Sequence, residues 1–393
     1  MTTIPQRDVV IFLGAGFAFD AGLPVMSAFG PQSREDYRTL AKHASENKKH
    51  AAQMLVEAAD VFYAFQKVCR RSPTVTSEDA ENLETVFCIA EAMNEAGLST
   101  IRLQDTDYAL DQLIEKIQLW LWKIYQQCPL LNRDRKTREQ TYTDFFGLLS
   151  ESCIWKRTTV ISTNYDLIFE YMSWKNGALC AYPFKGLSDG VNIINAGHGS
   201  TPYLRVNQDD PEVHFVLCKL HGSVNYFEDV SNSSDHKLFV AIDLGDDKPI
   251  GQSYNFLNKP AIFAVDAIWK IRNDYGQSLT PAIVPPTYAK VARKHWLASV
   301  WNYAFKALST ANTILFIGYS MPPTDGFMRA LIHAALATGT RTNRPNVFVV
   351  DPNSQVHENY SALFGASYRD IGRHTLEWAL KTKALHRVLE IAI

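Results

Sequence analysis

The sequence lacks an excess of charge of either sign, an export signal and long apolar runs. Its 393 residues include 39 basic and 41 acidic side chains, so the formal net charge of -2 gives no electrostatic argument for direct nucleic-acid binding. No apolar run approaches the roughly 20 residues that a membrane-spanning helix needs. Residues 1–9 lack the basic-then-apolar pattern of a signal peptide. The sequence therefore predicts a globular, cytoplasmic protein without a membrane partner.

The sequence also lacks several motifs that would identify common enzyme classes. None of its six cysteines forms a C-x-x-C pair, so neither a zinc ribbon nor a thioredoxin-like site is expected. There is no G-x-x-x-x-G-K-[ST] phosphate loop, no H-E-x-x-H and no G-x-S-x-G. These absences disfavour a P-loop NTPase, a zincin and a common serine hydrolase, and no metal site is predicted.

What is present is a series of short apolar runs that predict buried parallel strands. They cover residues 9–13, 158–163, 215–220, 313–317 and 346–350. Each precedes a polar or glycine-bearing turn, as strands that feed a ligand crevice do. The sequence thus predicts an α/β protein with a Rossmann-like, mostly parallel sheet flanked by helices, forming one domain over residues 1–393.

A helical insertion within this domain is predicted for residues 35–151, where helix-forming residues dominate. Its clearest helix follows Asp105, since apolar residues recur at helical spacing from Leu110 to Ile124. Asp105 and Asp107 are expected near the N-terminus of that helix, where negative charge is favourable.

Two later stretches, 187–211 and 229–260, are rich in Gly, Asn, Ser and Asp. They are expected to be loops or short hairpins between core strands. Residues 372–389 are expected to be helical.

Gly14-Ala15-Gly16 follows the first predicted strand and should precede a helix. Glycines at such a turn let the backbone approach a pyrophosphate, whose charge the helix N–H groups meet. The G-x-G-x-x-G fingerprint of hydride-transfer enzymes fails, because Phe19 occupies the third position and Glu35 and Asp36 follow no predicted strand. A tight strand-to-helix turn without a ligand remains an alternative.

Polar residues also follow two inner strands. Asn164 and Asp166 could hold a ribose or a water, although either could instead cap the helix that begins near Leu167. His221 stands at a glycine-flanked strand end and could act as a general base, although a lone histidine is more often structural.

The last two strands end in turns of similar character. Gly318 and Ser320 could present a backbone N–H and a hydroxyl to a ribose or phosphate, or could belong to a simple proline-containing turn. Asp351 could accept from an adenosine ribose hydroxyl, or could cap a turn with Pro352 and Asn353.

Taken in order, these segments resemble the sirtuin-like family. Residues 12–24, with the Gly-Ala-Gly turn, residues 219–223, Lys-Leu-His-Gly-Ser, and residues 317–325 carry most of the resemblance. More closely, the chain looks like the bacterial sirtuin-like NAD hydrolases of anti-phage defence. The resemblance implies a Rossmann-like sheet with NAD lying across its crevice.

The resemblance also implies which residues surround NAD. The pyrophosphate and its ribose would contact the first turn, at Gly14, Ala15, Gly16 and Phe17. Residues after the two late strands would approach the adenosine half, namely Gly318, Ser320 and Asp351. Asn164 and His221 would be the catalytic residues, with Asp166 lining the nicotinamide end.

The implied activity is that of an NAD glycohydrolase, which uses NAD as a substrate and gives nicotinamide and ADP-ribose. Sirtuin deacylases carry a small zinc module with two cysteine pairs, and this chain has none, so no zinc is expected. Two alternatives remain: an NAD-dependent protein deacylase, and a non-catalytic sensor of NAD or ADP-ribose.

Family behaviour further implies a latent NAD-depleting effector, because an unrestrained NAD hydrolase would drain its own cell. A homo-oligomer is expected, with contacts supplied by the helical insertion. A separate activating partner, such as a hexameric DNA-translocating ATPase or an Argonaute-like protein, would release the activity.

Overall fold

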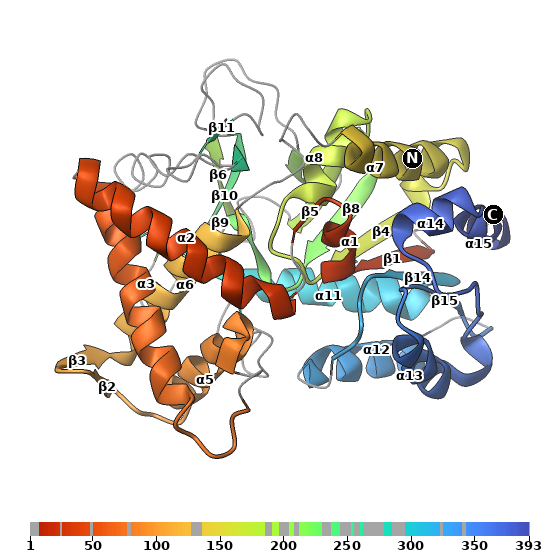
Figure 1. The fold of residues 1–393 in the computed structure, drawn as a ribbon. Helices are drawn as coiled ribbons and strands as arrows, with labels where there is room; N and C mark the ends of the chain where they lie inside the picture. Colours follow the sequence, from red (N-terminus) through yellow and green to blue (C-terminus); the bar gives the residue numbers. More distant parts are fainter. Residues whose placement is uncertain are drawn as a thin grey trace.

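Figure 1 shows a computed structural model of the 393-residue chain, in which a sheet wrapped by helices adjoins a separate group of helices. The residues that the structure describes are 8–23, 26–47, 50–76, 80–126, 136–184, 191–195, 204–207, 212–229, 237–243, 253–254, 260–261, 279–284, 295–322, 325–339 and 343–392. The first strand and the last helix of the described chain both belong to the sheet-containing part.

Seven strands within the described residues form one parallel sheet. Their order across the sheet is β15 (Asn346–Val350), β14 (Thr313–Ile317), β1 (Val9–Leu13), β4 (Thr158–Ser162), β8 (Phe215–Lys219), β5 (Cys180–Phe184) and β7 (Leu204–Asn207). Every neighbouring pair is parallel. The five strands expected from the sequence are all present, and they form continuous apolar runs because helices bury both faces of the sheet. The expected α/β, Rossmann-like architecture is confirmed.

The strand order reverses at β1. From β1 the chain moves to β4 and β8 on one side, and it returns for β14 and β15 on the other side. Leu13 pairs with both Ile317 and Ser162, and Ser162 pairs with Lys219, so the carboxyl ends of these strands lie at one edge. In open α/β sheets, such a reversal marks the crevice where ligands bind.

Helices cover both faces of this sheet (Figure 1). Those above it in that view are α7 (Lys136–Glu151), α8 (Ile168–Lys175), α14 (Leu376–Lys381) and α15 (Ala384–Ala392), and those below are α11 (His295–Thr310), α12 (Gly326–Thr338) and α13 (Ser354–Phe364). The short helices α1 (Ala15–Phe19), η2 (Trp155–Arg157) and η4 (Gly365–Ser367) complete this part. The C-terminal stretch expected to be helical forms α14 and α15. Although α7 falls within the expected insertion of 35–151, its residues Tyr142 and Phe146 pack against Phe17 and Phe169 of the sheet-containing part.

The separate group of helices consists of α2 (Met26–Asn47), α3 (His50–Cys69), α5 (Leu83–Glu95) and α6 (Leu110–Tyr125). A hairpin of β2 (Thr100–Leu103) and β3 (Thr106–Ala109) precedes α6. The side-chain oxygen of Asn82 accepts from the backbone N–H groups of Glu84 and Thr85, which fixes the start of α5. The apolar stripe of α6 packs against α3 and α5.

Asp105 and Asp107 do not lie at the N-terminus of α6, contrary to the expectation from the sequence. Asp105 belongs to the turn between β2 and β3, and Asp107 pairs with Arg102 across the hairpin. The positive φ of 56° at Gln104 allows the chain to reverse in this tight turn. The helix begins only at Leu110, and Asp111 is the acidic residue in its first turn.

A second sheet links the two parts and was not anticipated from the sequence. Its strands, in order, are β13 (Leu279–Ile283), β9 (Gly222–Asp229), β10 (Leu238–Asp243) and β6 (Val191–Asn195), and β11 (Ser253–Tyr254) pairs separately with β12 (Pro260–Ala261). The stretches 187–211 and 229–260, expected to be loops or short hairpins, thus contribute strands to both larger sheets, and much of the rest of them lies outside the described residues.

α6 is fixed to this second sheet by side-chain hydrogen bonds. Gln118 Nε2 donates to the carbonyl oxygen of Ile283 at 3.0 Å, and Trp122 Nε1 donates to that of Val224 at 2.8 Å. Both side chains are buried, so losing either bond would leave a polar group without a partner in the interior. The insertion is therefore attached to the sheet-containing part by specific buried contacts.

Three glycines bring the turns after β1 and β14 into backbone contact. The N–H of Gly14 donates to the carbonyl of Ile317 at 3.1 Å, and the N–H of Gly16 donates to that of Gly318 at 2.9 Å. A Cβ on Gly318 would lie 2.4 Å from backbone atoms of Gly16, and Gly318 also has a φ of +61°. The close approach of the two turns therefore requires glycine at these positions.

Gly318→Ala should destabilise the fold far more than a glycine substitution at a similar φ in open surroundings. Gly177 has a φ of +77°, and a Cβ at this position would meet no described atom within 4 Å. Gly177→Ala therefore reports the cost of positive φ alone, about 1–2 kcal/mol. Gly318→Ala must also separate two backbone turns and should cost ~3 kcal/mol or more. Urea unfolding followed by circular dichroism measures both losses of stability. Equal losses would show that the close approach is unimportant.

Candidate functional site

The residues singled out from the sequence follow five neighbouring strands of the main sheet. In order along its carboxyl edge they are Asp351 after β15, Gly318 after β14, Gly14 after β1, Asn164 after β4 and His221 after β8. Neighbouring strands lie about 4.8 Å apart. An elongated ligand of dinucleotide length lying across the strand ends would therefore pass all five positions.

Asn164 is anchored to the first turn. Its Nδ2 donates to the carbonyl oxygen of Gly14 at 2.9 Å, and its backbone N–H donates to Ser162 Oγ at 3.1 Å. The side chain is partly buried. Its amide oxygen, for which the described residues supply no donor, can accept a hydrogen bond from a water or from a ligand.

His221 lies just beneath this edge, with 3% of its surface exposed. Its Nε2 is 4.0 Å from Oδ2 of Asp325, and its ring centroid is 6.1 Å from that of Tyr165, the neighbour of Asn164. The backbone of His221 is fixed as well, because its carbonyl accepts from the N–H of Val284 at 2.9 Å. The imidazole is thus held beside a carboxyl group and close to the loop that carries Asn164.

Asp325 and Tyr319 are candidate functional residues that the sequence did not reveal. The Tyr319 hydroxyl donates to Asp325 Oδ2 at 2.7 Å, and this is the oxygen that faces His221. Burial raises the pKa of the Tyr319 phenol well above its usual value, so the hydroxyl remains a neutral donor. A carboxyl group in this position can orient the imidazole and stabilise its protonated form. One feature of the sequence pointed to Asp325: it is the last residue of the segment 318–325, which follows β14 and was expected to form a turn.

Asp166 has a structural role at the start of α8. Its Oδ1 accepts from the N–H of Ile168 at 2.9 Å, which is the capping alternative that the sequence left open. Its carbonyl accepts from Lys219 Nζ, which also lies 3.4 Å from Oε1 of Glu170. Burial raises the pKa values of Asp166 and Glu170, although the nearby ammonium of Lys219 opposes the shift. This buried cluster ties the loop after β4 to β8.

The first turn presents backbone rather than side chains to the edge of the sheet. The ring of Phe17 is buried and lies 5.1 Å from that of Tyr142. The N–H groups of Gly14, Gly16 and Phe17 all donate to backbone carbonyls. Ala15 is partly buried. The N–H groups of Gly14, Gly16 and Phe17, which were expected to meet the charge of a pyrophosphate, are thus already paired within the protein.

The residues expected to contact the adenosine half of NAD follow β14 and β15, and they differ in exposure and in hydrogen bonding. Ser320 is exposed and Gly318 is partly buried. Asp351 Oδ1 accepts from the N–H of Asn353 at 2.9 Å, so Asp351 caps the turn before α13. This is the capping role that the sequence left open as an alternative to ligand binding. Burial raises the pKa of Asp351.

Neither a metal site nor a membrane span is found among the described residues. They contain no group of three or more His, Cys, Asp and Glu side chains placed to hold a metal ion. None of their helices is long and apolar enough to cross a bilayer. In its described part, the site is built from amide, imidazole, carboxyl and phenol groups around a glycine turn.

A family model matches more than half of the 393-residue chain: the model of the SIR2-like domain matches residues 158–369. The matched segment begins with β4 and contains Asn164, His221, Gly318 and Asp351, whereas the first turn precedes it. A search of curated protein sequences finds no significant match to the chain.

Lys219→Met should destabilise the protein strongly, because it leaves Glu170 buried without its cation. The expected loss is about 3–5 kcal/mol in the free energy of unfolding, measured by denaturant titration. Lys219→Met/Glu170→Gln removes both charges and should be more stable than the single variant.

The matched control is Lys381→Met, which removes one partner of an ion pair on α14 whose side chains are 61% and 53% exposed. It should change stability by no more than about 0.5 kcal/mol. If Lys219→Met were as mild as Lys381→Met, the buried cluster would not hold the loop after β4.

Proposed function

Because this chain belongs to the SIR2-like domain family, whose members bind NAD, we propose that it binds NAD along the carboxyl edge of the main sheet and hydrolyses it. The products are nicotinamide and ADP-ribose. The observation that carries the proposal is the pairing of His221 with Asp325, 4.0 Å apart, beside the loop on which Asn164 is anchored to the glycine turn.

In the proposed reaction, the bond between the ribose anomeric carbon and nicotinamide breaks, and the electron pair leaves with neutral nicotinamide. A water oxygen forms the new bond to the anomeric carbon, and the proton lost from water passes to a base or to solvent. The transition state carries positive charge on the ribose, and only groups that favour it over bound NAD speed the reaction.

Asn164 and His221 are assigned complementary roles. The amide oxygen of Asn164 orients the water or the nicotinamide amide. The neutral imidazole of His221 accepts a proton from a ribose hydroxyl or strengthens its hydrogen bond, and Asp325 stabilises the charge that the ring then gains. The low exposure of the ring favours these interactions, because they act away from bulk water. Because so little of the His221 ring is exposed, the ribose must reach it from the edge of the sheet where Asn164 is partly exposed.

Hydrolysis is favoured over protein deacylation by the cysteine pattern. The zinc module beside the acyl-lysine cleft of sirtuin deacylases needs two cysteine pairs, and the chain has no C-x-x-C pair. The same proposal includes the residues that would contact the rest of NAD. The pyrophosphate and its ribose are assigned to Gly14, Ala15, Gly16 and Phe17, the nicotinamide end to Asp166, and the adenosine half to Gly318, Ser320 and Asp351.

The biological role that we propose is a latent NAD-depleting effector of bacterial anti-phage defence. An NAD hydrolase without restraint would drain its own cell, so a separate protein would release the activity. A hexameric DNA-translocating ATPase or an Argonaute-like protein is proposed as this partner, and the protein itself is proposed to form a cytoplasmic homo-oligomer through the helical insertion.

His221→Ala and Asn164→Ala should each slow nicotinamide release by about 10²–10⁴-fold, because each removes a group positioned at the reacting centre. Purified protein is incubated with NAD, with and without the product of the neighbouring gene, and nicotinamide is followed by chromatography. His333→Ala on α12 and Asn302→Ala on α11 are matched controls, since both side chains are exposed.

Adding an acyl-lysine peptide to this assay, and measuring NAD binding by calorimetry, separates the alternatives. Consumption of NAD only together with an acyl-lysine peptide, with formation of O-acyl-ADP-ribose, would indicate a deacylase. Calorimetric binding of NAD without product, with and without the partner, would indicate a sensor. Nicotinamide release at the wild-type rate by His221→Ala or Asn164→Ala would refute the assigned roles.

The proposed oligomer is tested by size-exclusion chromatography with light scattering. The expected result is a mass of at least twice 44.3 kDa for the chain alone, or a complex with its partner whose mass requires two or more copies of this chain. A monomer under both conditions would rule out assembly through the insertion.

A further inference from the structure

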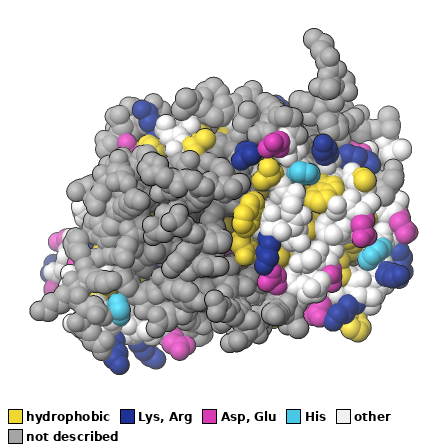
Figure 2. Space-filling model, turned by 90° about the horizontal axis from the view of Figure 1, so that it is seen from above, with side chains coloured by type: hydrophobic (Ala, Val, Ile, Leu, Met, Phe, Trp, Pro, Cys, Tyr) yellow, Lys and Arg dark blue, Asp and Glu magenta, His cyan; other side chains and the backbone are white. Residues whose placement is uncertain are grey.

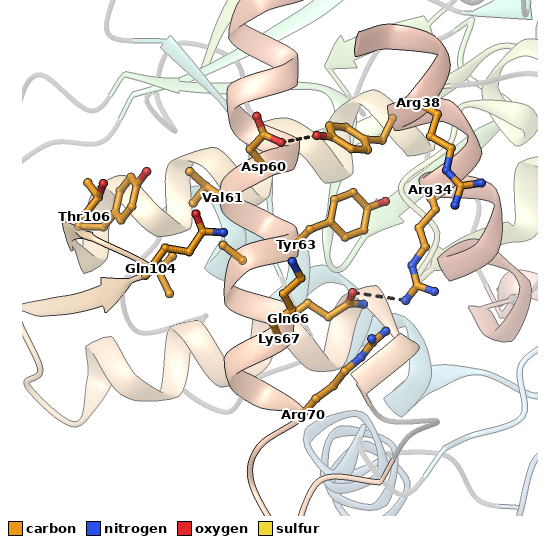
Figure 3. Close-up of a pocket in the computed structure, with 14 residues that line it drawn as sticks. Arg34, Arg38, Asp60, Val61, Tyr63, Gln66, Lys67, Arg70, Gln104 and Thr106 are labelled. Atoms are coloured by element: carbon orange, nitrogen blue, oxygen red, sulfur yellow. Dashed lines mark hydrogen bonds between the residues drawn. The ribbon is translucent and has the colours of Figure 1, made fainter. Parts of the chain in front are cut away.

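A pocket of about 600 Å³ opens within the helical insertion (Figure 3). Its walls come from α2, α3 and the β2–β3 hairpin. None of its lining residues belongs to the strand ends of the candidate functional site. Its volume falls within the range of about 300–1,000 Å³ that is usual for small-molecule sites.

Positive charge is concentrated along the helical walls of this pocket. Arg34 and Arg38 come from α2, and Lys67 and Arg70 from α3 and its end. Figure 3 shows Arg38, Arg34 and Arg70 along one side, whereas Gln104 and Thr106, which are uncharged, lie on the opposite side. A ligand in the pocket would therefore meet cations on one flank and neutral polar groups on the other.

The nearby carboxylates neutralise only part of this charge. Arg34 and Arg70 share a single partner, Glu81. Arg38 and Lys67 are exposed, and the described residues provide no ion-pair partner for either. Asp60, also in the lining, accepts from the hydroxyl of Tyr37. Asp36 is a further carboxylate close enough to act on Tyr63. The four cations of the lining thus outnumber the carboxylates Asp36, Asp60 and Glu81, in a chain whose formal net charge is only -2.

Aromatic side chains lie beside the cations. The ring centroids of Tyr37 and Tyr63 are 5.3 Å apart, and the ring of Tyr63 lies between α3 and the guanidinium groups in Figure 3. The hydrogen bond to Asp60 raises the pKa of Tyr37 to about 12, and burial raises that of Tyr63 to about 12. Both phenols are therefore neutral near pH 7 and do not repel an anion. Phenol rings provide flat surfaces on which a base can stack.

We propose that this pocket binds a nucleoside polyphosphate, with its phosphates against Arg38, Lys67 and Arg70 and its base against the tyrosines. Arg38 and Lys67 are exposed and have no carboxylate partner among the described residues, so they can bind phosphate oxygens by charge-assisted hydrogen bonds. Arg70 shares Glu81 with Arg34, so it adds a guanidinium whose charge is only partly neutralised. A nucleic-acid polymer is the less favoured ligand, because the basic side chains are gathered in one hollow rather than along an extended surface.

The pocket is tested by calorimetry on the full-length protein, with ATP, inorganic pyrophosphate and adenosine as probes. ATP is expected to bind most tightly, pyrophosphate more weakly and adenosine least, and ATP binding should weaken as salt is raised. Arg38→Ala/Lys67→Ala should weaken ATP binding by about 100-fold, roughly tenfold for each cation removed. Both residues are exposed, so the variant should keep the circular dichroism spectrum of the wild type.

Two controls locate the binding. Arg71→Ala removes an exposed cation next to Arg70 that does not line the pocket, and it should change ATP affinity by less than about twofold. Ser320→Ala should retain full ATP affinity, because that exposed residue belongs to the side of the strand-edge site that is proposed to take the adenosine half of NAD. Since the readout is binding, the result does not depend on whether the protein hydrolyses NAD.

Three results would each overturn the proposal. The first is no ATP binding by the wild-type protein. The second is ATP affinity that Arg38→Ala/Lys67→Ala leaves unchanged, which would place the nucleotide elsewhere. The third is tighter binding of an RNA oligonucleotide or a glutamate-rich peptide than of ATP, with the same sensitivity to the double substitution, which would make this pocket part of a macromolecular interface.

Discussion

Backbone contact between the turns after β1 and β14 is the constraint on which the rest of the site depends. Gly16 and Gly318 approach so closely that neither has room for a Cβ. Their contact places Tyr319 over Phe12, with ring centroids 4.6 Å apart, and the Tyr319 hydroxyl in turn holds the carboxyl group of Asp325. Asp325 faces His221. The imidazole is thus positioned through a chain of contacts that begins at a glycine turn on a different strand.

Much of this arrangement could be predicted from the sequence, because it follows from local patterns. Strands buried on both faces are apolar throughout, so five of the seven strands, β1, β4, β8, β14 and the edge strand β15, were visible as runs, and the residues after them were natural candidates for a site. The inner strand β5 was not predicted. The pairing of His221 with Asp325 was not visible, because it depends on where β8 and β14 lie in the sheet. The role of Asp166 was ambiguous for a different reason, since a carboxylate that caps a helix and one that binds a ligand are identical in sequence.

The parts of the fold that sequence patterns missed are those with mixed or short patterns. β6 and β10 are separated from their partners by polar stretches, which made the whole region resemble loops. β2 and β3 have four residues each and precede a strongly amphipathic helix, so the N-terminus of α6 was expected near Asp105 and Asp107, before the helix begins at Leu110. In both cases pairing between strands decided the structure, and such pairing leaves a weak signal in a single sequence.

The insertion and the sheet-containing part are physically connected near His221. The chain enters β9 directly after this residue, and β9 and β13 receive the hydrogen bonds from Trp122 and Gln118 of α6. The N–H of Val284, next to β13, donates to the carbonyl of His221. On its other side, α6 contacts α3, where the ring of Trp120 lies 6.3 Å from that of Tyr63 in the basic pocket. A single helix therefore separates the wall of that pocket from the strand that fixes the backbone of His221, and a displacement of α6 would bear on both.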